Sequence, residues 1–198
     1  MFKRPERSIC VFTGSRHGVS PVYAHAATEL ARELVKRGLG LVYGGGNVGL
    51  MNIIANTALE QGGYVIGVIP DALVSKEVAH AGLSELCVVH SMHERKALMA
   101  ELAAGFIALP GGIGTMEEFF EVLSWAQLGL HNKPCGLLNV ERYYDSLIEF
   151  LDYAVAKDFV KLKDRALLII ESQVTKLLDR FEATIAAPVV KKFDPSIS

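Results

Sequence analysis

The chain has 198 residues, a formal net charge of −2 and 51% apolar residues. This length suits one domain with a full hydrophobic core, and the scattered Lys and Arg residues do not form the basic patch of a general nucleic-acid binder. No apolar run reaches the roughly 20 residues of a membrane span, and the apolar run near the N-terminus, residues 9–12, is too short for a signal peptide, so we expect a cytoplasmic protein with neither membrane nor nucleic acid as a partner.

Short apolar runs alternate along the chain with segments of helical periodicity. Strands are predicted over residues 9–12, 39–43, 64–69, 86–89, 106–109, 136–138 and 167–170. Helices are predicted over residues 22–37, 50–61, 92–103, 114–128, 143–156 and 175–181. The alternation predicts an α/β fold: a single Rossmann-like, doubly wound domain over residues 1–187, with a mostly parallel sheet of about seven strands flanked by helices and a tail over 188–198. The ligand crevice is expected beyond the carboxyl ends of the strands.

Glycines follow three of the predicted strands, at residues 14, 44–46 and 111–112. Residues 44–49, GGGNVG, satisfy the dinucleotide-binding pattern GxGxxG, and Asp71 follows Gly49 by 22 residues after another strand. The pattern is short, however, and the chain has no room for a separate domain that presents a hydride acceptor. Close backbone packing or a contact with a ribose phosphate explains these glycines equally well.

The segment from Pro110 to Glu118 is the most informative part of the chain, because it joins a strand, a glycine turn and the start of a helix. Glycines let backbone N–H groups approach a ligand, and the helix directs its positive dipole end to the same point. Such a turn binds phosphate. A site that only binds phosphate does not need the negative charge of Glu118, so this residue suggests a catalytic role. The alternative is that Thr115 to Glu118 is a capping box.

A second capping box, Ser91 to Glu94, precedes the predicted helix over residues 92–103. The capping interpretation applies better to Glu94 than to Glu118. Arg95 and Lys96 follow one turn into this helix, whose N-terminus should also face the crevice. The alternative is that both belong to a solvated basic face, as is common for helical Arg and Lys.

Cysteines and histidines give no sign of a metal or redox site. Cys10, Cys87 and Cys135 are odd in number and lie in apolar strand-like runs, which favours buried reduced thiols over disulfides. The six histidines show no ligand spacing and are interpreted as surface or packing residues: His17, His25, His80, His90, His93 and His131. We expect neither a metal nor a cofactor.

Three segments resemble the LOG (Lonely Guy) family of cytokinin riboside 5′-monophosphate phosphoribohydrolases: residues 43–51, 92–96 and 110–118. The resemblance extends over nearly the whole chain, including residues 125–129 and 133–139, and the paired Arg-Lys and PGGxGTxxE motifs are specific. The departures are mild. Arg16 stands where many members have serine, Asn52 where many have glycine, and Ser124 where plant members have threonine, which bears on base preference and not on the reaction.

This resemblance implies hydrolysis of the N-glycosidic bond of adenosine 5′-monophosphates, with or without an N6 substituent, to free base and ribose 5-phosphate. It implies that Arg95 and Glu118 are catalytic. It also implies contacts with the nucleotide from Glu77, Lys96, Gly112, Ile113, Gly114, Thr115, Met116, Glu117 and Ser124. Further nucleotide contacts are expected from Gly14, Ser15, Gly45 and Gly46. Members of the family are homodimers or larger, with active sites near subunit contacts.

The chemistry of the residues agrees with this expectation. Cleavage passes through a transition state with oxocarbenium character, which a nearby carboxylate such as Glu118 can stabilise, or the carboxylate can orient the attacking water. Arg95 stays cationic and could hold a sugar hydroxyl, a phosphate oxygen or Glu118 itself. Two other classes remain: a non-catalytic carrier of a nucleotide or of the molybdenum cofactor, and a lysine decarboxylase. The latter would need pyridoxal phosphate, for which no lysine has a persuasive context.

Overall fold

The computed structural model describes residues 4–74 and 79–186. Its strands are β1 (Ser8–Phe12), β2 (Gly40–Tyr43), β3 (Val65–Pro70), β4 (Glu85–Val89), β5 (Gly105–Ala108), β6 (Cys135–Leu138) and β7 (Leu168–Glu171). The helices are α1 (Pro21–Lys36), α2 (Gly49–Glu60), α3 (Asp71–Val74), α4 (Met92–Leu102), α5 (Ile113–Gln127), α6 (Asp145–Ala156), α7 (Leu162–Arg165) and α8 (Val174–Ala186), with a 3-10 turn η1 (Val140–Arg142). The predicted α/β architecture is confirmed.

All seven strands are parallel and lie in the order β4-β3-β2-β1-β5-β6-β7. The chain builds outward from β1 to β4, crosses back through α4, and continues from β5 on the other side of β1. The order of the strands therefore reverses between β1 and β5, which pair from Ile9↔Gly105 to Phe12↔Ala108. In a doubly wound sheet, the crevice at the carboxyl end of such a reversal is where ligands bind.

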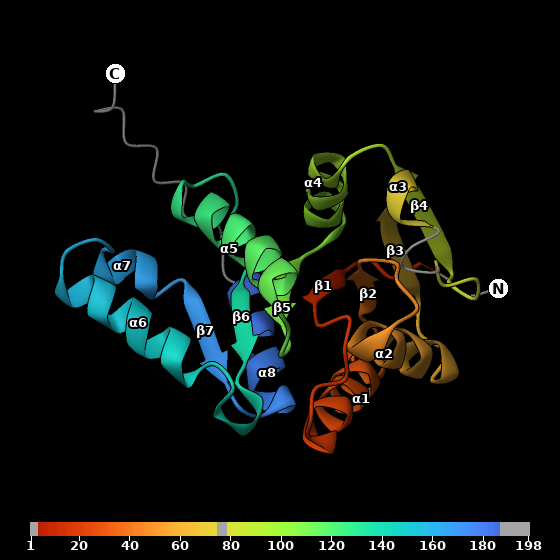
Figure 1. The fold of residues 1–198 in the computed structure, drawn as a ribbon, viewed down its shortest axis with the longest axis horizontal. Helices are drawn as coiled ribbons and strands as arrows, with labels where there is room; N and C mark the ends of the chain where they lie inside the picture. The colour runs from red at the N-terminus through yellow and green to blue at the C-terminus, as the bar shows by residue number, and fades with distance from the viewer. Residues whose placement is uncertain (1–3, 75–78, 187–198) are drawn as a thin grey trace.

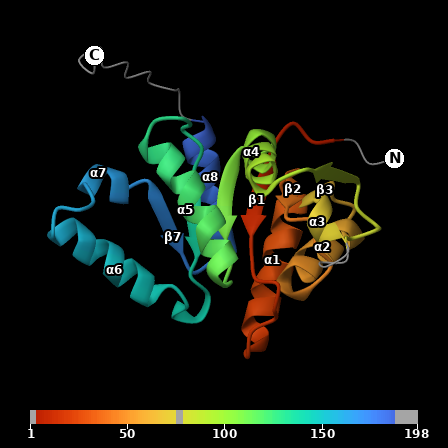
Figure 2. The same ribbon diagram turned by 45° about the horizontal axis from the view of Figure 1, so that its top comes forward.

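Helices cover both faces of the sheet (Figures 1 and 2). Residues of α1, α2 and α8 pack with Ile9, Val11 and their neighbours on one face. Residues of α4, α5 and α6 pack with Cys10, Phe12 and their neighbours on the other. Successive strand residues point to opposite faces, so a strand buried on both sides is largely apolar, as β1 is from Ile9 to Phe12.

The ends of α1 follow from local sequence signals. Ser20 caps the N-terminus, its side chain accepting from the Val22 N–H at 3.4 Å, and Pro21 occupies the first helical position. Gly38 follows the C-terminus with a φ of +69°, a conformation that favours glycine. The sequence did not predict the short elements α3, η1 and α7, and α8 runs five residues beyond its expected end at residue 181. The expected tail lies outside the described residues.

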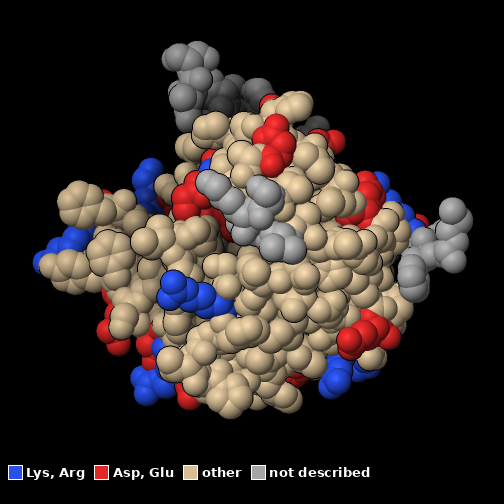
Figure 3. All heavy atoms as spheres, turned by 45° about the vertical axis from the view of Figure 1, so that its right-hand side comes forward, with Lys and Arg blue, Asp and Glu red and all other residues tan. Residues whose placement is uncertain are grey.

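The three cysteines are free, and Cys10 and Cys135 are buried, as predicted, while Cys87 is partly exposed. Burial raises the pKa of Cys135 to about 12, so its thiol stays protonated near neutral pH. Figure 3 shows one side of the molecule, on which Lys and Arg are few and separated by uncharged side chains. Within residues 4–74 and 79–186, no helix is long and apolar enough to cross a membrane.

Candidate active site

The loops that follow β1 and β5 meet at the point where the strand order reverses. The Gly14 N–H donates to the Pro110 carbonyl at 3.2 Å. A cavity of about 310 Å³ opens beside these loops. Its lining consists of Thr13, Gly14, Ser15, Met51, Leu73, Met92, Arg95, Gly112, Ile113, Gly114, Thr115, Glu117 and Glu118. The cavity therefore lies in the predicted crevice and joins the loops after β1 and β5 to α4 and α5.

Helix α5 directs its N-terminus into this cavity. The helix begins at Ile113 with Gly112 as its N-cap, and no side chain of the described residues caps it. The first N–H groups of a helix have no partner within the helix, so those of α5 are available to an anion. Because the helix starts at Ile113, Thr115 is its third residue and not its cap. The capping-box interpretation of Thr115 and Glu118 was therefore wrong.

Arg95 is buried and held by the carboxyl ends of two strands. Its Nε donates to the Val68 carbonyl in β3 at 3.1 Å, and its Nη2 donates to the Gly44 carbonyl after β2 at 3.1 Å. Nη1 lies 3.5 Å from Oε1 of Glu118. The interpretation of Arg95 as part of a solvated basic face was therefore wrong. Of the partners left open by the sequence, Glu118 is the one that pairs with Arg95 in the structure.

The glycines after β2 make room for this arginine. A Cβ on Gly44 would lie 2.0 Å from Nη2 of Arg95. Gly45 and Gly49 adopt φ values of +76° and +55°, and a Cβ on Gly49 would lie 2.3 Å from the backbone of Ser15. Close packing thus explains the GxGxxG pattern, and none of its glycines lines the cavity in the described part of the chain.

Glu118 sits one helical turn beyond the N-terminus of α5. Its side chain is 12% exposed, on the side of the helix that faces Arg95. Residues four apart share a face of an α-helix, so Glu118 lies on the same face as Gly114, about 6 Å farther along the axis. The Glu118 carboxylate therefore lies about one turn from the uncapped N-terminus of α5.

Lys96 is also buried, but it points toward the flank of α5. Its Nζ pairs with Oε1 of Glu117 and lies 3.0 Å from Oε2 of Glu121. Burial alone would lower the pKa of Lys96, but the two carboxylates outweigh it and raise the pKa above its ordinary value of 10.5. Lys96 therefore ties α4 to α5, and it is not part of the cavity lining.

Glu94 behaves as a cap. The Ser91 hydroxyl accepts from the Glu94 N–H at 3.1 Å, and the Glu94 carboxylate accepts from the His90 N–H at 2.9 Å. In a capping box the glutamate accepts from the N–H of the N-cap residue, here Ser91. The Glu94 carboxylate instead accepts from the N–H of His90, one residue before the N-cap. The predicted capping role of Glu94 is confirmed.

The structure brings most of the predicted site residues together and leaves some apart. Gly14, Ser15, Arg95, Gly112, Ile113, Gly114, Thr115, Glu117 and Glu118 line one cavity. Met116 is partly buried and packs against the core on the face covered by α4, α5 and α6. Gly45 packs against Val68 and Ile69 of β3, and neither Gly45 nor Gly46 belongs to the cavity lining. Ser124 lies 11 residues along α5 from Ile113, about 16 Å away. Glu77 lies outside the described residues.

Sequence reasoning missed four residues of the cavity: Thr13, Met51, Leu73 and Met92. Met51 and Met92 belong to segments that carried the family resemblance, so proximity to those motifs could have identified them. Leu73 lies in α3, a four-residue helix with no periodicity to detect. An adjoining cavity of about 560 Å³ shares Gly14, Ser15, Gly112 and Ile113 with the first, and adds Arg16, Tyr23 and Tyr143.

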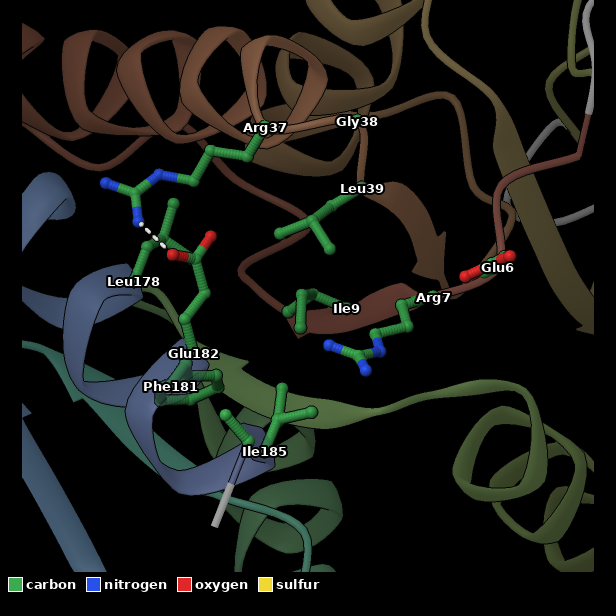
Figure 4. Close-up of a pocket in the computed structure, with 11 residues that line it drawn as sticks. Glu6, Arg7, Ile9, Arg37, Gly38, Leu39, Leu178, Phe181, Glu182 and Ile185 are labelled. Atoms are coloured by element: carbon green, nitrogen blue, oxygen red, sulfur yellow. Dashed lines mark ion pairs between the residues drawn. The ribbon is translucent and has the colours of Figure 1, made fainter.

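A different cavity, of about 620 Å³, lies at the opposite ends of the strands, between α1 and α8 (Figure 4). One of its two arginines, Arg37, pairs with three carboxylates: Glu33 at 3.0 Å, Asp179 at 2.8 Å and Glu182 at 3.3 Å. The charge of Arg37 is thus already compensated, and the lining of this cavity includes neither glycine turn. We therefore assign the candidate active site to the smaller cavity between β1 and β5.

Two histidines have structural roles. Nδ1 of His80 accepts from the Gly82 N–H at 3.1 Å, and its Nε2 lies 2.8 Å from Oδ1 of Asn56. His131 likewise bonds the Val122 carbonyl at 2.9 Å. Among the residues that the structure describes, no group of three or more His, Cys, Asp or Glu side chains could hold a metal ion.

Comparison with known proteins identifies the family of the chain. The family described as "possible lysine decarboxylase" matches residues 51–181. Cytokinin riboside 5′-monophosphate phosphoribohydrolase LOG5 of Arabidopsis thaliana is 48% identical over 182 residues, covering 92% of this chain and 78% of that protein. The cytokinin riboside 5′-monophosphate phosphoribohydrolase of Rhodococcoides fascians is 51% identical over 165 residues, 83% of each chain.

Among solved structures, the molybdenum cofactor carrier protein of Chlamydomonas reinhardtii matches with a TM-score of 0.68 at 20% identity, covering 93% of this chain and 100% of that one. That likeness concerns the fold alone. The match to the family over residues 51–181 and the relatives that are 48% and 51% identical over their aligned residues show that the chain belongs to the LOG family, whose sequence model carries the description "possible lysine decarboxylase".

Proposed function

We propose that the chain hydrolyses the N-glycosidic bond of adenosine 5′-monophosphates, plain or N6-modified, and releases the free base and ribose 5-phosphate. The observation that carries the proposal is the pairing of Glu118 with Arg95 one turn from the uncapped N-terminus of α5, inside one cavity. The relatives' names describe this reaction on cytokinin riboside 5′-monophosphates.

The 5′-phosphate binds at the start of α5 in this proposal. The N–H groups of the first turn and the helix dipole attract an anion, and Gly112 and Gly114 have open space where side chains would otherwise stand. Binding energy from the phosphate holds the sugar in place while the bond to the base breaks. A nucleoside without phosphate should therefore react poorly.

Glu118 acts on the sugar. As the glycosidic bond breaks, positive charge develops on the ring, and a carboxylate beside the anomeric carbon stabilises it or orients the attacking water. The positive charge of Arg95 stabilises the ionised carboxylate at 3.5 Å. Because two backbone carbonyls fix the guanidinium, Arg95 also holds Glu118 in a defined position.

The base then faces the apolar part of the cavity. Met51, Leu73 and Met92 line it together with Arg95. The two methionines are flexible and polarisable, and such side chains adapt to planar ligands of different size. Lys96, Glu117 and Ser124 stay proposed contacts of the nucleotide, and a bound nucleotide would have to compete with carboxylates for Lys96.

A non-catalytic carrier of nucleotides is the alternative, and the fold shared with the molybdenum cofactor carrier protein favours its consideration. A carrier would use the same anion site, but it would have no need for a carboxylate placed beside it and held by a buried arginine. Catalytic turnover separates the two functions.

The test is to incubate the purified protein with AMP, isopentenyladenosine 5′-monophosphate and their dephosphorylated forms, and to quantify free base by chromatography. We expect release of base from the phosphorylated forms at rates well above those of the nucleosides. Binding of AMP without release of base would favour the carrier. Equal hydrolysis of the nucleosides would contradict the phosphate anchor.

A homodimer in the cytoplasm is part of the same proposal. Helix α6 and the segment that follows it expose Phe150, Tyr153, Phe159 and Leu162, whose side chains are 60–88% exposed. Contiguous exposed apolar side chains are typical of subunit interfaces. Light scattering coupled to gel filtration should give twice the mass of the chain, and a monomer would contradict this part. The free cysteines favour a reducing compartment.

A further inference from the structure

The carbonyl groups of the glycine turn after β5 are held from outside the turn. The Leu109 carbonyl accepts from the Tyr144 hydroxyl at 2.6 Å, and the Gly111 carbonyl accepts from the Tyr143 hydroxyl at 2.6 Å. The Pro110 carbonyl between them accepts from the Gly14 N–H at 3.2 Å. Three successive peptide groups thus have their orientation set by other segments of the chain.

Fixing a carbonyl also fixes the N–H of the next residue. The peptide group is planar, and in the trans form its C=O and N–H point in opposite directions; the peptide bonds of the described residues are trans. The bond from Tyr143 to the Gly111 carbonyl therefore sets the direction of the Gly112 N–H. Gly112 lines the candidate active site and carries no side chain that could lock its backbone.

Tyr143 and Tyr144 directly follow a strained backbone segment. They follow η1, in which Glu141 and Arg142 have φ values of +51° and +60°, a region that residues with side chains rarely adopt. Asn139 supports the turn, its Oδ1 accepting from the Tyr144 N–H at 2.8 Å and its Nδ2 donating to Asp145 at 2.8 Å. Strained backbone of this kind persists where the surroundings over-determine it, and it clusters at functional sites.

Neighbouring rings add to this support. Tyr144 is buried against the sheet, and Tyr143 lies edge-on to Tyr144 and to Tyr23, with ring centroids 4.9 and 5.9 Å apart. Since β6 pairs with β5, the segment after β6 emerges beside the glycine turn. The Tyr143 hydroxyl is therefore delivered to the Gly111 carbonyl by sheet topology together with the strained turn.

We propose that Tyr143 is a positioning residue for recognition of the substrate's phosphate: it orients the Gly111–Gly112 peptide so that the Gly112 N–H faces the anion site before the ligand arrives. This inference rests on the proposed function. Without the hydroxyl, the peptide between two glycines is free to rotate, and binding of phosphate must then bear the cost of ordering it.

Tyr144 provides a matched control. Its hydroxyl makes the same kind of bond at the same distance, but to the peptide between Leu109 and Pro110, and proline has no N–H to orient. Tyr143→Phe and Tyr144→Phe therefore each remove one tyrosine hydroxyl that bonds a carbonyl of the glycine turn. Only the peptide group bonded by Tyr143 carries an N–H. Tyr64→Phe, which removes a hydroxyl bonded to Glu85 at the far edge of the sheet, controls for loss of a phenol elsewhere.

The experiment measures the Kd of AMP, ribose 5-phosphate and adenosine by calorimetry, with thermal melting of each variant. For Tyr143→Phe we expect the Kd of AMP and of ribose 5-phosphate to rise about three- to tenfold, with the Kd of adenosine unchanged. For Tyr144→Phe we expect a lower melting temperature and an unchanged ratio of the AMP and adenosine affinities. The KM for AMP should follow its Kd in both variants.

Each other outcome has a definite meaning. If Tyr143→Phe leaves the AMP-to-adenosine ratio unchanged, or if both tyrosine variants lower it equally, the positioning role is refuted while the proposed function stands. If the unmodified protein itself binds AMP no better than adenosine, the phosphate site of the proposed function fails, and this inference fails with it.

Discussion

Replacement of Gly44 by alanine should disable the enzyme through Arg95, because Gly44 itself does not line the cavity. The added Cβ would lie 2.0 Å from Nη2 of Arg95 and 3.2 Å from its Cζ, whereas real Cβ contacts essentially never fall under 3.0 Å. The guanidinium must therefore move by at least about 1 Å, away from the Gly44 carbonyl that it bonds at 3.1 Å. Gly44 has no positive φ, so the clash is the main cost of the substitution.

The size of the effect follows from that displacement. A misplacement of about 1 Å in an active site can cost about 10²-fold in rate, and Arg95 holds Glu118, so we expect kcat/KM for AMP to fall by about that factor. Loss of one hydrogen bond from a charged group costs about 1.5–3 kcal/mol. In a chain of this length that corresponds to a melting temperature lower by about 3–12 °C.

The assay is release of adenine from AMP, measured beside a thermal melt. Gly82→Ala is the matched control, because its new Cβ would approach only the His80 ring, at 3.3 Å, far from the cavity. A Gly44→Ala protein with kcat/KM within twofold of the unmodified enzyme would refute the reasoning, since it would show that the position of Arg95 is not needed for turnover.

Three other predictions concern charged residues. Glu118→Gln should lower kcat by about 10²-fold or more while calorimetry still detects AMP binding; near-normal kcat would exclude Glu118 from the chemistry. Glu94→Ala should cost about 1 kcal/mol of unfolding free energy in urea with turnover retained, and lost turnover in a stable protein would reverse the roles of Glu94 and Glu118. Because the folded state raises the pKa of Lys96 above 10.5, the stability from its ion pairs is complete below that pH and is lost as pH rises through the higher folded pKa. Melting curves of Lys96→Met should lack this alkaline loss, and parallel pH profiles would contradict the ion pairs.

Much of the fold could be predicted from the sequence because its signals are local. Apolar runs and helical periodicity predicted all seven strands and the six longer helices. The anion site at the turn of residues 110–112 stays a prediction. The elements that sequence missed, α3, η1 and α7, span only three or four residues each. Periodicity cannot be detected over so short a segment.

The candidate site was predicted in part, and its errors have physical causes. The capping-box interpretation of Thr115 was wrong because the motif does not specify where a helix begins, and α5 begins at Ile113, two residues before Thr115. Likewise, Arg95 could be read as solvent-exposed from its helix alone, since Arg and Lys on helices usually are.

By itself, the sequence determined the alternation of strands and helices and the placement of glycines at strand ends, because both depend on residues close together along the chain. Only the tertiary structure decided what those glycines do. Gly44 and Val68 accept from an arginine 51 and 27 residues away, and Tyr143 reaches Gly111 across 32 residues. Such partners are chosen by strand order and packing, which no local pattern records.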